Sequence, residues 1–346
     1  MKFSEMPYTR PDAEALKKQM SQLTERLKSA ASYEEARQVF LEKEAASRTV
    51  ETQATLASIR HSIDTRDTFY DGEEKFWNTF GPELEEYEQA WKAAMLDSPF
   101  RKDFSAEYGD LMFLNAEIAR KCFKPEIIPE MQQENDLTQE YEKLLASAQI
   151  PFEGKTYTLS QLTPLKSDPD DARRLAAWQA DAKWSMEHAA ELDELYDKLV
   201  HLRDSMGKKM GYEGYTTLGY YRMNRNCYTK EDVEKFRTAV QKYLVPVADK
   251  ICRKQAERLG KTYPLSFADL ALEFRSGNPC PMGTPDDILA QGMKFYGELS
   301  PETKVFFRTM LDNELLDVLS TEGKQAGGYC TSLGDYEVPF IFANFN

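Results

Sequence analysis

Residues 326–346 read AGGYCTSLGDYEVPFIFANFN. Helical patterns dominate the chain before this stretch, and here the spacing of apolar residues changes to the short, aromatic and β-branched pattern of two strands. The first predicted strand follows Gly327 and Gly328, and the second begins at Val338. We therefore expect a mostly α-helical protein with a small β-sheet at the C-terminal end.

The two glycines before the first strand have no side chains that would cover the backbone. A strand edge left open in this way can hydrogen-bond an extended peptide as an added strand, independent of the peptide's sequence. The alternative is an ordinary hairpin in which Gly327 and Gly328 form a bulge. Composition alone favours that alternative, so both interpretations stay open at this point.

The first 150 residues have the pattern of successive amphipathic helices. Four apolar residues have the spacing that places them on one face of a helix, namely Leu16, Met20, Leu23 and Leu27. Ser32 and Glu35 have capping-box spacing, which predicts the start of a second, long helix. Further helices are predicted over 71–96, with a break or kink at Gly81-Pro82, and around 102–121 and 126–148.

The pattern changes at residues 150–159, which predict a short β-hairpin that turns at Glu153-Gly154. This hairpin is the best candidate for a boundary between two parts of the chain. We expect an N-terminal helical lobe over residues 1–150 and a second, largely helical part over 151–346.

Proline at the first helical position predicts the start of three later helices, at Pro169, Pro285 and Pro301. The first of these is expected to run to Met210 and to stop at Gly211. Its predicted buried stripe consists of Leu192, Leu195, Tyr196, Leu199, Leu202 and Met206.

Another long helix is predicted between two terminal signals, the cap residue Thr229 and Gly260, with a kink at Pro246. The stretch 276–283 is rich in proline and glycine, and we expect an irregular loop there.

Composition excludes several classes of protein. Of the 346 residues, 41% are hydrophobic and 29% charged, which is typical of a folded helical protein. The net charge of −14, without any basic stretch, argues against binding of nucleic acid. No apolar run approaches membrane-spanning length and the first residues lack a signal-peptide core, so we expect no membrane contact and a cytoplasmic location.

The five cysteines are scattered, and none forms a Cys-x-x-Cys pair. We expect reduced, mostly buried thiols. The three histidines, His61, His188 and His201, include no pair at the spacing of four that a helical metal site requires. We interpret all three as surface or satisfied helix residues, and we expect His201 to pair with Asp197.

Short motifs of other enzyme classes are incomplete. Residues 205–208 match Ser-x-x-Lys, but the companion motifs are missing. Residues 154–156 and 260–262 imitate the end of a phosphate loop, but Gln149 and Gln255 stand where the first glycine is required. Because the chain has 58 acidic residues, we interpret neighbouring carboxylates as solvated helix faces.

The segment 215–228, YTTLGYYRMNRNCY, is rich in tyrosine and arginine. These residue types make good walls for a peptide groove, since they offer flat area and directed donors. They are equally suited to filling a helix junction and neutralising acids, and the sequence does not choose between the two.

Several longer strings together resemble the oligoendopeptidase F type of zinc metallopeptidase, in the thimet oligopeptidase-like family. They occur in family order: KLVHLR at 198–203, KMGY at 209–212, LGYYRMNR at 218–225, LVP at 244–246, LSPET at 299–303, GGYC at 327–330 and PFIFANFN at 339–346. Each string alone is weak evidence, and their combination is specific. The N-terminal helices match in character and length.

This resemblance implies a multi-helical clamshell with a deep channel, and an enzyme that hydrolyses internal bonds of short peptides. The family holds one catalytic zinc ion through a His-Glu-x-x-His helix and a later glutamate. That motif begins shortly after the position that matches Asn346. We therefore expect a truncated form of the fold, with no catalytic and no metal-binding residues in this stretch.

The resemblance assigns substrate binding to Gly327, Gly328, Tyr329 and Cys330, with residues 340–345 supporting that strand from within the sheet. We expect this stretch alone to be inactive and to bind no zinc. We also expect residues 338–345 to need a covering surface from beyond the chain, and hence aggregation. The alternative from another class is a non-catalytic helical peptide-binding or scaffold protein.

Overall fold

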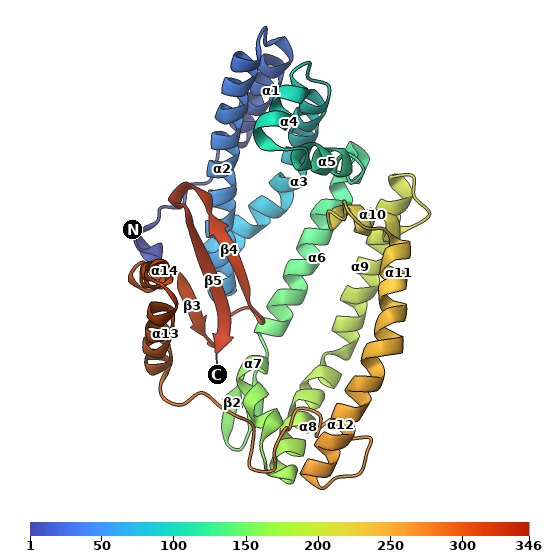
Figure 1. The fold of residues 1–346 in the computed structure, drawn as a ribbon, viewed down its shortest axis with the longest axis vertical. Helices are drawn as coiled ribbons and strands as arrows, with labels where there is room; N and C mark the ends of the chain where they lie inside the picture. The colour runs from blue at the N-terminus through green and yellow to red at the C-terminus, as the bar shows by residue number, and fades with distance from the viewer. Residues whose placement is uncertain (346) are drawn as a thin grey trace.

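The computed structural model describes residues 1–345, and these are mainly helical (Figure 1). The helices of the first half are α1 (Ala13–Ser29), α2 (Tyr33–Ile63), α3 (Thr68–Leu96), α4 (Arg101–Tyr108), α5 (Leu111–Ala119), α6 (Ile128–Ala146) and α7 (Leu159–Leu162). Those of the second half are α8 (Asp171–Glu187), α9 (Ala189–Lys209), α10 (Tyr215–Arg222), α11 (Lys230–Ala239), α12 (Val245–Leu259), α13 (Pro285–Leu299) and α14 (Pro301–Asp312). The strands are β1 (Ile150–Phe152), β2 (Lys155–Tyr157), β3 (Leu316–Leu319), β4 (Tyr329–Leu333) and β5 (Val338–Phe345).

The first two helices form as their apolar spacing and caps predict. All four residues of the predicted face of α1 are buried, namely Leu16, Met20, Leu23 and Leu27. At the start of α2 the Ser32 hydroxyl accepts a hydrogen bond from the Glu35 amide (3.3 Å). The Glu35 carboxylate accepts from the Ala31 amide (2.8 Å), one residue before the cap. One of the backbone donors that a helix start leaves free is thereby satisfied, and so is the amide just before the cap.

Helix α3 runs through Pro82 without a break, so of the break or kink expected there only the kink stays a prediction. A second prediction in the first half was wrong. The helix predicted over 102–121 is two helices, because Gly109 adopts a φ of +87° between α4 and α5. Glycine takes this left-handed conformation at little cost, and it ends a helix.

The long helix predicted from Pro169 to Met210 was also wrong. Helix α8 begins two residues later, with Asp170 as its cap, and it is separated from α9 by His188. The His188 ring stacks on Trp184 (centroids 4.4 Å apart) at this break. In the predicted stripe of α9, Tyr196 is 72% exposed, whereas Leu195, Leu202 and Met206 are buried.

The residues that were predicted to begin or end the helices after residue 228 are confirmed in these positions. Thr229 caps α11 and Gly260 ends α12 with a φ of +69°. Between them the residues before Pro246 form a π-helical turn, η4 (Val240–Leu244), which accommodates the proline. Thr284 and Ser300 cap α13 and α14.

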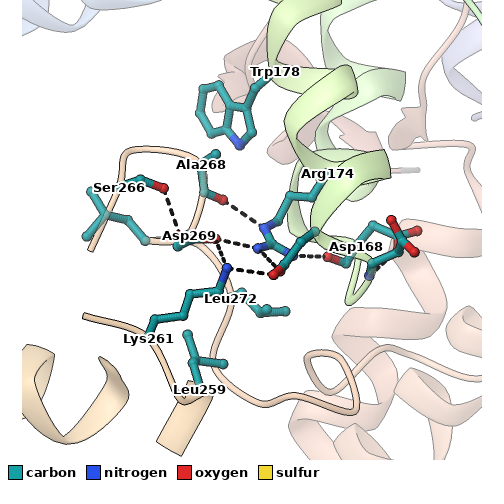
Figure 2. A network of polar contacts seen from close by, with 12 residues as sticks. Asp168, Arg174, Trp178, Leu259, Lys261, Ser266, Ala268, Asp269 and Leu272 are labelled. Atoms are coloured by element: carbon teal, nitrogen blue, oxygen red, sulfur yellow. Dashed lines mark hydrogen bonds and ion pairs between the residues drawn. The ribbon is translucent and has the colours of Figure 1, made fainter. Parts of the chain in front are cut away.

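A buried arginine ties the loop after α12 to α8 (Figure 2). Arg174 is 1% exposed, and its guanidinium donates to the Ala268 carbonyl (3.0 Å) and to the Asp269 carboxylate. Lys261 adds a second cation at 3.0 Å from the same carboxylate, so the charge of Asp269 is compensated. Burial acts to raise the pKa of Asp269, but the hydrogen bonds from Arg174 and Lys261 lower it to about 2.

The C-terminal strands form a sheet of order β3-β5-β4, with β4 antiparallel and β3 parallel to β5. Strand β3 was not predicted. Phe340 and Phe342, which alternate along β5, are each 1% exposed and belong to one core cluster with Leu56 of α2 and Phe3. The expectation that β5 needs a covering surface from beyond the chain was therefore wrong for this face of the strand.

The elements are arranged so that the sheet stands beside α2, and β4 is the strand nearest to α6 (Figure 1). The hairpin of β1 and β2 turns at Glu153 and Gly154, both with positive φ, as predicted. The mostly helical fold class, with a hairpin near 150–160 and a small sheet at the C-terminal end, is confirmed. A domain boundary at residue 150 stays a prediction. Asn346, the last residue of the predicted second strand, lies outside the described residues.

Candidate functional site

The candidate site begins at the outer edge of β4. Within residues 1–345 this strand pairs with β5 alone, in a register that places Tyr329 opposite Phe342 and Thr331 opposite Phe340. The other edge of β4 has no strand partner. Its backbone N–H and C=O groups on that side are available to a further strand.

A cavity of about 560 Å³ lies against this strand. Strand β4 contributes Tyr329, Cys330 and Thr331 to its wall, and the facing walls are formed by α2, α3 and α6. Arg222, at the end of α10, also lines it. The lining is mainly polar, and no helix of the described residues combines the length and apolarity needed to cross a membrane.

The four residues assigned to substrate binding are not equivalent in their positions. Tyr329 and Cys330 line the cavity, whereas Gly327 and Gly328 come directly before β4 and are exposed. Gly327 has a φ of +88°, and a Cβ there would meet no atom within 4 Å. A Cβ on Gly328 would lie 3.0 Å from the Phe342 carbonyl oxygen, so the absent side chain of Gly328 permits close packing on β5.

Tyr329 carries an unusual polar group, because its hydroxyl is buried behind the surface of the cavity wall. Its ring stacks on Phe342 (centroids 4.8 Å apart), but its hydroxyl is buried and has no hydrogen-bond partner among the described residues. The neighbouring Ser62 hydroxyl donates to Gln325 instead (2.7 Å). Burial raises the pKa of Tyr329 to about 12, so the phenol stays protonated at neutral pH. A buried phenol without a well-formed hydrogen bond is a cost to the stability of the fold.

A buried carboxylate on the cavity wall is held by two arginines. Glu134 of α6 is 5% exposed and accepts from Arg203 Nε (2.7 Å) and Arg222 Nη2 (2.7 Å). Burial acts to raise the pKa of Glu134, but the bonds from Arg222 and Arg203 hold it below its ordinary value. Segment 215–228 was interpreted either as the wall of a groove or as a helix junction that neutralises acids. Arg222 supports both interpretations, because it neutralises Glu134 and also lines the cavity.

Two other carboxylates on the cavity wall have no such partner. Glu74 of α3 and Glu142 of α6 line the cavity and make no hydrogen bond or ion pair with any described residue. Burial, followed by repulsion from Glu142 and Asp71, raises the pKa of Glu74 to about 7. Burial also raises the pKa of Glu142. Sequence reasoning missed both residues, because nothing in their local pattern separates them from the other acids of the chain.

The three histidines and the cysteines other than Cys330 do not line this cavity. His201 is exposed, and its Nδ1 lies 3.4 Å from Asp197 Oδ1, as predicted. His61 is 2% exposed, so it is not a surface residue; its Nε2 lies 3.6 Å from Asp71 Oδ1, too far for a hydrogen bond. The cysteines are unpaired as expected, but Cys227, Cys280 and Cys330 are exposed, so the expectation of mostly buried thiols was wrong.

No group of three or more His, Cys, Asp or Glu side chains within residues 1–345 is arranged to hold a metal ion. The resemblance places the family's zinc ligands outside these residues, and we derive no chemical step through a metal from them.

The fold and the site together define a class: a mostly helical protein in which the free edge of a small sheet borders a polar cavity of about 560 Å³. Comparison with known proteins narrows this class. Residues 3–123 match the family described as the peptidase M3 N-terminal domain. No curated protein matches the sequence.

Solved structures match over the whole length of the chain. A protein of Bacillus anthracis strain Ames that is named oligoendopeptidase F is 40% identical, with a TM-score of 0.98 over 100% of this chain and 63% of its own. A second structure with that name is 39% identical, with a TM-score of 0.97 over 100% of this chain and 61% of its own. Pz peptidase A, solved with an inhibitor, is 40% identical, with a TM-score of 0.97. The match covers 99% of this chain and 61% of Pz peptidase A.

The resemblance to the oligoendopeptidase F type of peptidase is thus confirmed in both sequence and fold. The chain spans about 63% of the length of the first of these relatives.

Proposed function

We propose that this chain forms the substrate-holding part of a zinc-dependent metalloendopeptidase that hydrolyses internal bonds of short peptides. The identity of 40% to proteins named oligoendopeptidase F, over the full chain, supports a peptidase. The match of the N-terminal region to peptidase M3 supports the same class.

The observation that carries the proposal is the free edge of β4 beside a cavity. An extended peptide that adds to this edge is held by main-chain hydrogen bonds, which every peptide can make. The peptide then lies in a fixed register, with its side chains alternating between the cavity and solvent. Tyr329 and Cys330 are the residues that it contacts, and Phe342 supports Tyr329 from behind.

The zinc ion belongs to the intact enzyme in this proposal, and its ligands lie outside residues 1–345. By the resemblance, the family's His-Glu-x-x-His helix would lie in the part of the relatives that this chain does not cover. The 346-residue chain is accordingly expected to hold peptides without cleaving them.

Cysteine footprinting tests the binding step with a control inside the same molecule. Cys330 and Cys280 are both exposed, but only Cys330 lines the cavity. The chain is treated with iodoacetamide, with and without an excess of an alanine hexapeptide, and alkylation is followed by mass spectrometry. The peptide is expected to slow alkylation of Cys330 by about tenfold and to leave Cys280 unchanged. Equal rates at Cys330 with and without peptide would contradict the proposal.

Hydrolysis is tested on the polypeptide encoded by the complete reading frame that contains this sequence. We expect it to cleave an internally quenched octapeptide, to lose this activity with a chelator and to regain it with zinc. Peptide binding without any hydrolysis by that polypeptide would support the alternative of a non-catalytic peptide-binding protein.

A further inference from the structure

We propose that Asn344 is a positioning residue for the substrate, because it holds the peptide unit between Gly327 and Gly328 so that the Gly328 N–H faces the free edge of β4. That N–H then donates a hydrogen bond to a backbone carbonyl of the bound peptide, next to the part of the peptide that pairs with β4. This inference rests on the proposed function, since it adds a contact and its support to the same site.

The first support is the pair of hydrogen bonds that the Asn344 side chain makes. Its Nδ2 donates to the Gln325 carbonyl (3.0 Å) and to the Gly327 carbonyl (2.7 Å), so both hydrogens of the amide are used. Both acceptors lie in the segment that leads into β4, whereas Asn344 itself lies in β5. The side chain therefore ties the start of the substrate strand to the neighbouring strand.

The register of the sheet shows what this side chain replaces. Strand β4 pairs with β5 as far as Tyr329, which lies opposite Phe342. Continued by two residues, the same register would bring Gly327 opposite Asn344. Gly327 has a φ of +88°, however, so its backbone leaves the extended path of the strand. Asn344 thus supplies a hydrogen bond from its side chain at a point where the backbone ladder has ended.

The geometry of the peptide bond then gives the direction of the Gly328 N–H. In a trans peptide unit the C=O and the following N–H point in opposite directions, and the bond between Gly327 and Gly328 is trans. Because the Gly327 carbonyl accepts from Asn344 on β5, the Gly328 N–H points away from β5, to the side of the free edge. Gly328 is exposed, and its N–H has no acceptor among the described residues.

The chain on both sides of the two glycines is fixed in place. The Gln325 amide donates to the Ser62 carbonyl at the end of α2 (2.9 Å). The Gly323 carbonyl accepts from the Thr65 amide (2.9 Å) and from the Thr65 hydroxyl (2.8 Å). The ladder with β5 follows the glycines. A donor held in this way loses little freedom when a peptide binds, so its orientation contributes to affinity.

The test is isothermal titration of the chain with alanine hexapeptides that each carry a backbone ester in place of one amide. An ester carbonyl is a weaker acceptor, so the natural chain is expected to lose about tenfold in affinity at each carbonyl that accepts from the edge. In Asn344→Leu, the loss at one of these positions is expected to fall to less than about twofold, because the Gly328 N–H is no longer held toward the peptide. The losses at the other positions should stay.

This profile separates positioning from stability. A variant that only loosened the fold would weaken the binding of every peptide alike and leave the differences between ester positions unchanged. The control is Asn313→Leu, which removes a half-buried side-chain amide that donates to the Thr309 carbonyl (3.0 Å) at the end of α14. It should keep the ester profile of the natural chain.

A second measurement needs no variant. Hydrogen exchange of the natural chain, resolved to single amides, is compared with and without a saturating alanine hexapeptide. Exchange of the exposed Gly328 amide is expected to slow by about tenfold when the peptide is bound. Gly283, an exposed glycine in the loop before α13, should exchange at the same rate in both samples.

The outcomes distinguish this inference from the proposed function. An ester profile that is the same in the natural chain and in Asn344→Leu overturns the role of Asn344, and so does a Gly328 amide that the bound peptide leaves unprotected. Either result leaves the proposed function standing. Absence of binding by every hexapeptide overturns the proposed function itself.

Discussion

Single residues in this chain divide into those whose role follows from local pattern and those whose role depends on the fold. Ser32, Thr229 and Gly260 act at helix ends, where the necessary bonds are made within a few residues. Glu74 and Glu142 become special only because α3 and α6 place them on one cavity wall. No spacing in the sequence encodes that placement, so the sequence predicted the caps and missed the acids.

The uncompensated charge of Glu74 gives a stability prediction. Its pKa is about 7 in the folded chain, above the ordinary value near 4.5, so the folded state binds the proton more tightly than the unfolded state. The stability of the folded chain therefore falls as the pH rises from about 4.5 to above 7. Glu74→Gln removes this loss, and at pH 8.5 it is expected to be more stable than the natural sequence by on the order of 1–3 kcal/mol.

The measurement is urea unfolding followed by circular dichroism at pH 4 and pH 8.5. The two chains should be equally stable at pH 4, where the carboxyl is protonated in both the folded and the unfolded state. Glu86→Gln serves as the control on α3. A Glu74→Gln chain that is less stable at pH 8.5 would contradict the account of this site.

At the scale of elements, the helices whose ends carry caps, glycine or proline are predicted well, and the breaks at Gly109 and His188 are not. A glycine inside a helical pattern is compatible with a helix, and only the packing around it decides whether the chain turns there. The sheet depends on pairing over long separations: β3 was missed because four residues carry little pattern, and its partner β5 lies more than 20 residues further along the chain.

The loop between α12 and α13 depends on Arg174, and this gives a prediction at the same scale. Arg174→Gln leaves Asp269 inside the protein without its main partner, and removal of one member of a buried ion pair costs about 3–5 kcal/mol. The free energy of unfolding is expected to fall by this amount, as measured by urea unfolding. The neighbouring Arg173, whose ion pairs with Glu153 and Asp168 are more exposed, provides the control Arg173→Gln, with a smaller loss expected. An equal fall in the free energy of unfolding in both variants would contradict a specific stabilising role for the buried contacts of Arg174.

At the scale of the whole molecule, the N-terminal residues and the C-terminal sheet share one core. Phe3 packs on Phe340 with ring centroids 4.4 Å apart, and the Phe3 amide donates to the Asn313 carbonyl (2.8 Å). The sheet is thereby fixed against α2, and α6 is fixed against α3 by bonds such as that from Asn78 to Gln139 (3.1 Å). These contacts hold the two sides of the cavity at a set separation, which a register-specific peptide site requires.

The central claim is that an extended peptide adds to the free edge of β4 through its backbone. A scan of single N-methyl groups along the alanine hexapeptide, with affinity for the chain measured by isothermal titration, tests this most directly. Since alternate amides of an added strand face β4, methylation at every second position should weaken binding by about tenfold, and methylation at the intervening positions should change it by less than about twofold. Equal effects at all positions, or no effect at any, would contradict the claim.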